Sequence, residues 1–192
     1  MSSIKTYTIF AGVNGAGKST LFEINKGENL GVRLNTDEMV KEAGKDWKDN
    51  VAQIEAGKQL IRLQTKCFTE GLSLNRETTL NGENIVKSII KAKELGYGIH
   101  LRYVGVEKPE IAKERVKRRI ELGGHGVSEE TIDKRFSGAL ENLKKIYHLC
   151  DTINIYDNSG EAIVLGAYLH NGKLEKTSVE CKWIEELIRE LN

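Results

Sequence analysis

A short segment near the start of the chain constrains the fold and the chemistry more than any other. Residues 12–20 read GVNGAGKST, which matches the phosphate-binding pattern G-x-x-x-x-G-K-[ST]. A β-rich run (TYTIFA, residues 6–11) precedes this loop, and a helical pattern follows from residue 19 to about residue 24. The motif requires this order of strand, loop and helix. We therefore expect the chain to hold a nucleotide by its phosphates.

The residue types of the loop suit that task. Glycines allow the backbone to fold around phosphates and to turn its N–H groups inward. Lys18 is placed to reach the β- and γ-phosphates of ATP, and Ser19 to ligate Mg²⁺. The loop does not separate kinases from ATPases or GTPases, although the N-K-x-D motif of GTPases is absent from the sequence. The candidate nucleotide-binding residues of the loop are Gly12, Asn14, Gly15, Ala16, Gly17, Lys18, Ser19 and Thr20.

Strand-like and helical patterns alternate along the rest of the chain. Such alternation predicts a mainly parallel α/β sheet, here of five to six strands, covered by helices on both faces. No composition shift marks a boundary, so residues 1–192 are expected to form a single domain. Further strands are expected at 31–35, 72–77, 99–106 and 152–156, with one or two more in 162–169, and helices at 37–43, 46–70, 83–95, 109–122, 128–148 and 181–191.

The composition excludes several classes of protein. Lys and Arg total 29 against 28 Asp and Glu, so the formal charge of +1 argues against a dedicated nucleic-acid binder and against disorder. No run of 18 apolar residues predicts a membrane span, and the first residues do not resemble a secretory signal. The three cysteines are far apart and fit a reducing compartment. A cytoplasmic location is the expectation.

Polar residues follow the second predicted strand, where the active sites of open α/β sheets lie. Asn35, Thr36 and Asp37 stand at this strand end. An Asp beside the γ-phosphate can accept the proton of an attacking hydroxyl, or it can hold Mg²⁺ through water. The alternative is that Thr36 or Asp37 only caps the short helix that follows.

A carboxylate and two hydroxyls follow the third predicted strand. Glu77, Thr78 and Thr79 stand together there. This group can bind a polyhydroxylated acceptor, or it can be an ordinary turn. Together with Asn35 and Asp37, these residues are the candidate acceptor-binding set.

Two arginine-bearing helical patterns flank a glycine-rich break at residues 123–126. Arg119 on the first and Arg135 on the second flank the apolar faces, which suits a lid at about residues 109–148 that brings guanidinium groups onto a transferring phosphoryl group. The alternative is two ordinary helices with exposed arginines. His125 in the break is interpreted as a polar loop residue.

Taken together, these segments resemble the zeta toxin family, in particular its shorter zeta-like bacterial members. The resemblance covers about residues 5–160 in the same order. It rests on FAGVNGAGKST at 10–20, NTDE at 35–38, ETTL at 77–80, GH at 124–125, RF at 135–136 and YDNS at 156–159.

The resemblance implies a three-layer P-loop kinase fold with a helical lid and a C-terminal extension at about 160–192. Zeta toxins phosphorylate a sugar hydroxyl of UDP-N-acetylglucosamine with ATP and Mg²⁺. By this resemblance Lys18 would grip ATP, Asp37 would act as base and Glu77 would touch the sugar. Arg119 and Arg135 would clamp the phosphates. Asn158 would lie near the adenine, by analogy with P-loop kinases.

We therefore expect an ATP-dependent kinase of a small acceptor such as a sugar nucleotide, with an antitoxin protein as a possible partner. One alternative is a nucleotide-dependent switch or slow ATPase with a protein partner. Another is a nucleotide or RNA end kinase, against which the near-neutral charge argues.

Overall fold

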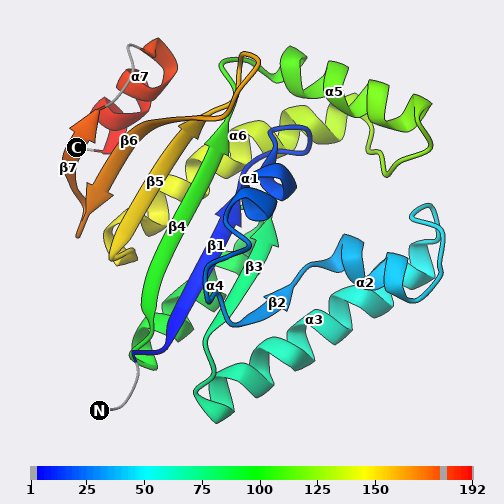
Figure 1. Cartoon of the computed structure of the whole chain (residues 1–192), viewed down its shortest axis with the longest axis horizontal. Helices are drawn as coiled ribbons and strands as arrows, with labels where there is room; N and C mark the ends of the chain where they lie inside the picture. The colour runs from blue at the N-terminus through cyan, green and yellow to red at the C-terminus, as the bar shows by residue number, and fades with distance from the viewer. Residues whose placement is uncertain (1–3, 178–180, 192) are drawn as a thin grey trace.

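The computed structural model describes residues 4–177 and 181–191. They form a seven-stranded sheet in the order β2-β3-β1-β4-β5-β6-β7 (Figure 1). The first five strands in this order are parallel, and β6 and β7 are antiparallel additions. The strands are β1 Thr6–Ala11, β2 Val32–Leu34, β3 Leu74–Thr78, β4 Gly98–Gly105, β5 Thr152–Asp157, β6 Val164–His170 and β7 Lys173–Thr177.

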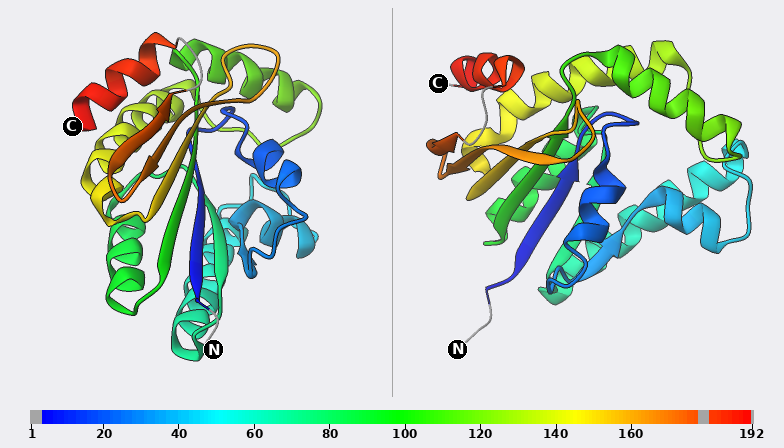
Figure 2. Two further views of the ribbon diagram at one scale, coloured as in Figure 1. Left: turned by 60° about the vertical axis from the view of Figure 1, so that its left-hand side comes forward. Right: turned by 45° about the horizontal axis from the view of Figure 1, so that its top comes forward.

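Helices cover both faces of the sheet, which confirms the predicted α/β architecture (Figures 1 and 2). None of the helices in the described part of the chain is long and apolar enough to cross a membrane. The helices are α1 Lys18–Ile24, α2 Thr36–Glu42, α3 Asn50–Glu70, α4 Glu83–Glu94, α5 Pro109–Glu121, α6 Glu129–Ile146 and α7 Lys182–Leu191, with a 3₁₀ turn at Tyr147–Leu149.

Side-chain alternation along the central strand β1 divides the apolar residues into two cores. Tyr7 and Ile9 pack on one face with buried residues of α3, α4, α6 and α7. Phe10 points to the opposite face and packs with α1 and α5, including Leu21 and Val116. The sheet is therefore the middle layer of a three-layer sandwich.

The prediction of five to six strands was too low. The missed strand is β7, whose residues 173–175 are exposed at the edge of the sheet, so it lacks the alternating apolar pattern that marks a half-buried strand. The available signal was the Asn171-Gly172 pair, which joins β6 to β7 with positive φ at both residues (+49° and +74°). This pair is typical of a tight hairpin turn.

The segment expected to be a lid divides between the two cores. Ile132, in the first turn of α6, packs with α5 in the smaller core, whereas Leu143 and Ile146 are fully buried in the larger one. The second half of α6 therefore belongs to the helical layer that packs against the sheet. The α5–α6 turn is the part that lies beside the α2–α3 loop (Figure 2).

One buried amide fixes the turn that follows β3. Asn142 on α6 is 5% exposed, and its Nδ2 donates to the carbonyls of Leu80 (2.9 Å) and Gly82 (3.0 Å). Leu80 has a φ of +56°, which is costly for a residue with a side chain. The two hydrogen bonds hold this strained turn beside the residues that end β3.

We predict that Asn142→Leu lowers the free energy of unfolding by about 2–4 kcal/mol, because it removes two hydrogen bonds and leaves the buried carbonyl of Leu80 without a donor. Urea denaturation followed by circular dichroism measures the loss. The exposed neighbour Glu141→Gln serves as the control and should change stability by less than about 0.5 kcal/mol. Equal stabilities of the two variants would show that the amide does not hold the turn.

Candidate active site

The loop between β1 and α1 has the backbone that phosphate binding needs. Gly12, Gly15 and Gly17 have φ values of +144°, +84° and +104°, which favour glycine. A Cβ at Gly12 would collide with the carbonyl of Val104, and one at Gly15 with the carbonyl of Ala112. The glycines therefore let the loop lie directly against the neighbouring backbone.

Lys18 is held inside this loop rather than extended into solvent. It is 8% exposed, and its Nζ donates to the carbonyl of Val13 at 3.3 Å. Burial lowers the pKa of the Lys18 ammonium, while the nearby Glu77 and Asp37 carboxylates oppose the shift. The ammonium therefore lies in a partly dehydrated setting, in which a phosphate would be a strong partner.

Asn158 follows β5 and forms a hydrogen bond to the phosphate loop. Its Nδ2 donates to the carbonyl of Ala16 at 2.7 Å, and its backbone N–H donates to Gly105 at 2.9 Å. Arg115 donates to the carbonyl of Asn158 at 2.7 Å. In this conformation the Asn158 amide is occupied by the phosphate loop, and its place near an adenine stays a prediction.

Glu77, at the end of β3, connects the phosphate loop to the far side of the site. Its Oε1 accepts a hydrogen bond from the Ser19 hydroxyl at 2.9 Å. Its Oε2 accepts from Arg33 Nη2 at 2.7 Å and from Asn35 Nδ2 at 3.1 Å. Arg33 also binds Glu38 at 2.8 Å. Sequence reasoning missed Arg33, although an arginine between Val32 and Leu34 in a short strand was a signal of a specific partner.

Asp37 lies in the first turn of α2, and its carboxylate does not cap this helix. The cap is Asn35, whose Oδ1 accepts from the backbone N–H groups of Asp37 (2.9 Å) and Glu38 (3.4 Å). This finding excludes the interpretation of Thr36 or Asp37 as the cap. The Asp37 side chain is 48% exposed, so its carboxylate can meet a ligand.

The turn between α5 and α6 carries His125, and the two helices that it joins carry Arg119 and Arg135. The His125 ring contacts the ring of Trp47 in the α2–α3 loop, with centroids 5.1 Å apart and a tilt of 49°, and its Nδ1 lies 3.9 Å from Asp37 Oδ1. Arg135 Nη1 donates to Asn14 Oδ1 at 2.7 Å. Arg119 buries its Nε and one Nη without a hydrogen-bond partner among the described residues.

These elements enclose a cavity of about 700 Å³. Half of the candidate residues line it. The candidates outside its lining are Gly12, Gly15, Ala16, Gly17, Ser19, Thr20, Arg119 and Asn158. The predicted residues that line it are Asn14, Lys18, Asn35, Asp37, Glu77, Thr78, Thr79 and Arg135.

The site has oxygen ligands that fit Mg²⁺. The Ser19 hydroxyl and Glu77 carboxylate stand 2.9 Å apart beside the phosphate loop. Within residues 4–177 and 181–191 no cluster of three or more His, Cys, Asp or Glu is arranged for a metal. Magnesium is commonly held by one or two protein oxygens together with substrate phosphates and water. A hydroxyl and one carboxylate therefore suffice for a nucleotide-bound ion.

Comparisons with known proteins show which proteins this chain is similar to. An uncharacterized protein of Haemophilus influenzae is 31% identical over 127 residues, which cover 66% of this chain and 89% of that protein. The AvrRxo1-ORF1:-ORF2 complex with ATP aligns with a TM-score of 0.67 at 16% identity, over 100% of this chain and 65% of that one. The present chain thus spans slightly less than two thirds of that structure.

A structure of the PezAT chromosomal toxin–antitoxin system of Streptococcus pneumoniae aligns with a TM-score of 0.64 at 22% identity, over 97% of this chain and 78% of that one. At these identities the two structures show a shared fold. The family model described as zeta toxin matches residues 3–169, which include every element around the cavity from β1 to β5. The chain therefore belongs to the zeta toxin family.

Proposed function

We propose that this protein is an ATP-dependent phosphotransferase that acts on a hydroxyl of a small molecule. The observation that carries the proposal is that one cavity is lined by Lys18 of the phosphate loop and by Asp37, whose carboxylate does not cap a helix. Phosphoryl transfer needs a cation that binds the phosphates and a carboxylate that accepts the proton of the attacking hydroxyl. The structure of the AvrRxo1 complex with ATP supports the choice of nucleotide.

In this proposal the residues divide the reaction among them. Lys18 grips the β- and γ-phosphates, and Ser19, with Glu77 beside it, would hold a Mg²⁺ ion that neutralises phosphate charge. Asp37 accepts the proton of the acceptor hydroxyl. The hydroxyl oxygen attacks the γ-phosphorus, and ADP leaves. Arg119 and Arg135 balance the charge on the moving phosphoryl group.

The acceptor we propose is a sugar nucleotide such as UDP-N-acetylglucosamine. Asn35, Glu77, Thr78 and Thr79 offer amide, carboxylate and hydroxyl groups to a sugar in the same cavity as Asp37. Family membership supports this choice, and the toxin–antitoxin origin of the PezAT structure supports an antitoxin as a protein partner. We propose a cytoplasmic location, where ATP and such acceptors are available.

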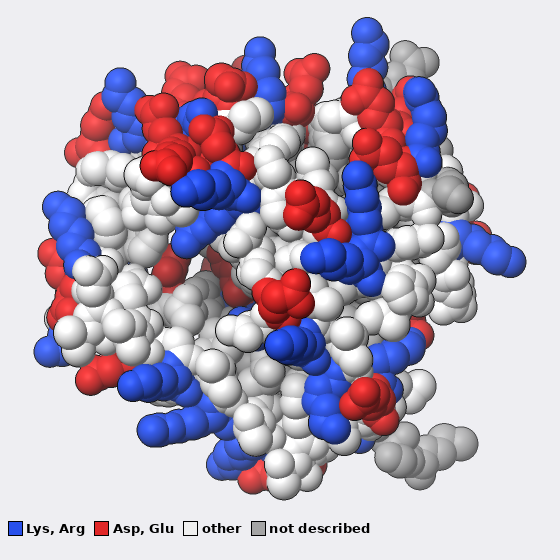
Figure 3. All heavy atoms as spheres, turned by 180° about the vertical axis from the view of Figure 1, so that it is seen from behind, with Lys and Arg blue, Asp and Glu red and all other residues white. Residues whose placement is uncertain are grey.

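The charge distribution on one face of the molecule favours a small acceptor over a polynucleotide. On the face drawn in Figure 3, Lys and Arg side chains are interspersed with Asp and Glu rather than gathered in a basic stripe. A nucleic-acid-binding face would show clustered basic residues.

We predict that Asp37→Asn lowers kcat for transfer by about 10²–10⁴-fold, the range for loss of a general base. ATP affinity should stay within a few-fold, because the carboxylate serves the acceptor. Transfer from γ-labelled ATP to a panel of sugar nucleotides measures the rate, and calorimetry measures ATP binding.

Two variants control this experiment. Lys18→Ala should lose both transfer and ATP affinity, since it removes the phosphate contact. Glu42→Gln, at an exposed position of the same helix as Asp37, should change neither. If Asp37→Asn retains the wild-type rate, Asp37 is not the base.

The charge state of His125 gives a second prediction. Burial lowers the pKa of His125 despite the nearby Asp37, so the imidazole is neutral near pH 7 and leaves the Asp37 charge free for the acceptor. When the folded-state pKa is depressed, the unfolded chain binds more protons below pH 6.5 or so, and stability falls as pH falls.

The stability advantage of wild type over His125→Asn should therefore shrink as pH drops from 7.5 towards 5.5. Urea denaturation of both proteins at several pH values measures this difference. An advantage that grows on acidification would mean that His125 is protonated and paired with Asp37 in the folded protein.

A further inference from the structure

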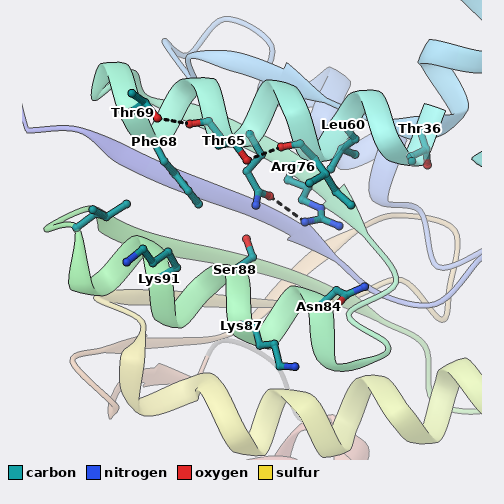
Figure 4. A pocket seen from close by; sticks show the side chains of 14 residues that line it. Thr36, Leu60, Thr65, Phe68, Thr69, Arg76, Asn84, Lys87, Ser88 and Lys91 are labelled. Atoms are coloured by element: carbon teal, nitrogen blue, oxygen red, sulfur yellow. Dashed lines mark hydrogen bonds between the residues drawn. The ribbon is translucent and has the colours of Figure 1, made fainter. Parts of the chain in front are cut away.

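The C-terminal helix α7 packs on the same face of the sheet as α3, α4 and α6, because its buried residues belong to the larger core. It lies beyond residue 169, where the zeta toxin match ends. On this face α3 and α4 leave a cavity of about 730 Å³ between them (Figure 4). Helix α7 instead lies directly on the sheet. A Cβ at Gly105 would collide with the Trp183 ring, and one at Gly166 with Ile184.

Trp183, in the first turn of α7, connects this helix to the end of β5. Its indole Nε1 donates a hydrogen bond to Asp157 Oδ1 at 2.9 Å. The same oxygen accepts from the Ser159 hydroxyl at 2.6 Å and from the Ser159 backbone N–H at 3.2 Å. We call residues 157–160 the β5 turn. One carboxylate oxygen therefore shapes this turn and binds it to α7.

Two further elements hold the β5 turn. After β4, the backbone N–H of Glu107 donates to the Ser159 hydroxyl at 2.8 Å. From α5, Arg115 donates to the carbonyls of Asn158 (2.7 Å) and Gly160 (3.1 Å). The conformation of the turn therefore depends on contacts from α5, from α7 and from the segment that follows β4.

The β5 turn lies directly against the phosphate loop. The Asn158 amide that donates to the carbonyl of Ala16 leaves no room for a Cβ at Gly17. The N–H groups of such a loop bind phosphates when they point inward together, so the contacts that fix the loop also set its affinity. The contacts run from α7 to Asp157, then along the β5 turn, and then to the phosphate loop.

We propose that Trp183 is a positioning residue for ATP binding, which acts through Asp157 and the β5 turn on the phosphate loop. The inference rests on the proposed function and adds to its site a residue that lies outside the zeta toxin match. Trp183 does not line the cavity that holds Lys18 and Asp37. Loss of its N–H donor should therefore weaken nucleotide binding without removing a reacting group.

Two variants remove the hydrogen bond from its two ends. Trp183→Phe keeps an aromatic ring over Gly105 and removes the N–H donor. Asp157→Ala removes the acceptor and also the contact with Ser159. Lys182→Gln, at the exposed position next to Trp183, is the matched control. Circular dichroism checks that each variant is folded, and the stoichiometry of binding counts the folded molecules.

Calorimetric titration with Mg²⁺ and a non-hydrolysable ATP analogue tests the proposal. We expect Trp183→Phe to weaken binding about threefold to tenfold, as loss of a hydrogen bond to a charged group would. Asp157→Ala should weaken binding at least as much, and the double variant should bind no more weakly than Asp157→Ala, because the two residues act through one contact. Lys182→Gln should bind as wild type does.

Three results would overturn the proposal. The first is wild-type affinity for the analogue in Trp183→Phe, which would leave Trp183 with a structural role alone. The second is full additivity of the two losses in the double variant, which would mean that Trp183 does not act through Asp157. The third is absence of analogue binding to the wild-type protein.

Transfer assays separate these results from failure of the proposed function. Trp183→Phe should raise the KM for ATP by about the same factor as it weakens analogue binding, and leave kcat within about twofold. If analogue binding depends on Trp183 but no acceptor is phosphorylated, the positioning role stands and the kinase proposal fails. If an acceptor is phosphorylated with the same KM for ATP in wild type and Trp183→Phe, the kinase stands and the positioning role fails.

Discussion

The carboxylate of Glu77 is the contact on which the arrangement of the site depends. It accepts a hydrogen bond from Ser19 on one side and from Arg33 and Asn35 on the other. These residues lie up to 58 positions apart in sequence, and the parallel pairing of β3 with both β1 and β2 brings them together. Because the carboxyl ends of parallel strands lie at one edge of the sheet, a single side chain can join the phosphate loop to the helix that carries Asp37.

Charge is distributed over this edge in a way that suits transfer between two anionic molecules. Lys18, Arg76 and Arg135 line the same cavity, and Arg135 donates a hydrogen bond to Asn14 of the phosphate loop. Asp37 lines the same cavity, and its carboxylate is not engaged as a helix cap. In the proposed function this accessible carboxylate accepts the proton of the acceptor hydroxyl.

The sequence predicted the parts of the site that depend on local chain chemistry. Glycine spacing with Lys18 predicted a glycine-dependent loop between β1 and α1, and the position of Asp37 after a strand predicted a residue that lines the same cavity as Lys18. Arg33 and Arg76 were missed because their contacts, with Glu77 and Gln64 respectively, arise from the pairing of β2 with β3 and from the packing of α3 on the sheet. These long-range contacts leave no local pattern. The edge strand β7 was missed because an exposed edge needs no apolar alternation.

The central claim is that the γ-phosphate of ATP goes to an acceptor hydroxyl rather than to water. Phosphorus NMR of the wild-type protein with Mg²⁺, ATP and UDP-N-acetylglucosamine follows that phosphate directly. We expect the γ signal of ATP to be replaced by a phosphomonoester signal on the sugar, at a rate that depends on the acceptor. Inorganic phosphate as the sole product, formed at the same rate with and without the acceptor, would contradict the claim and support a nucleotide-hydrolysing switch.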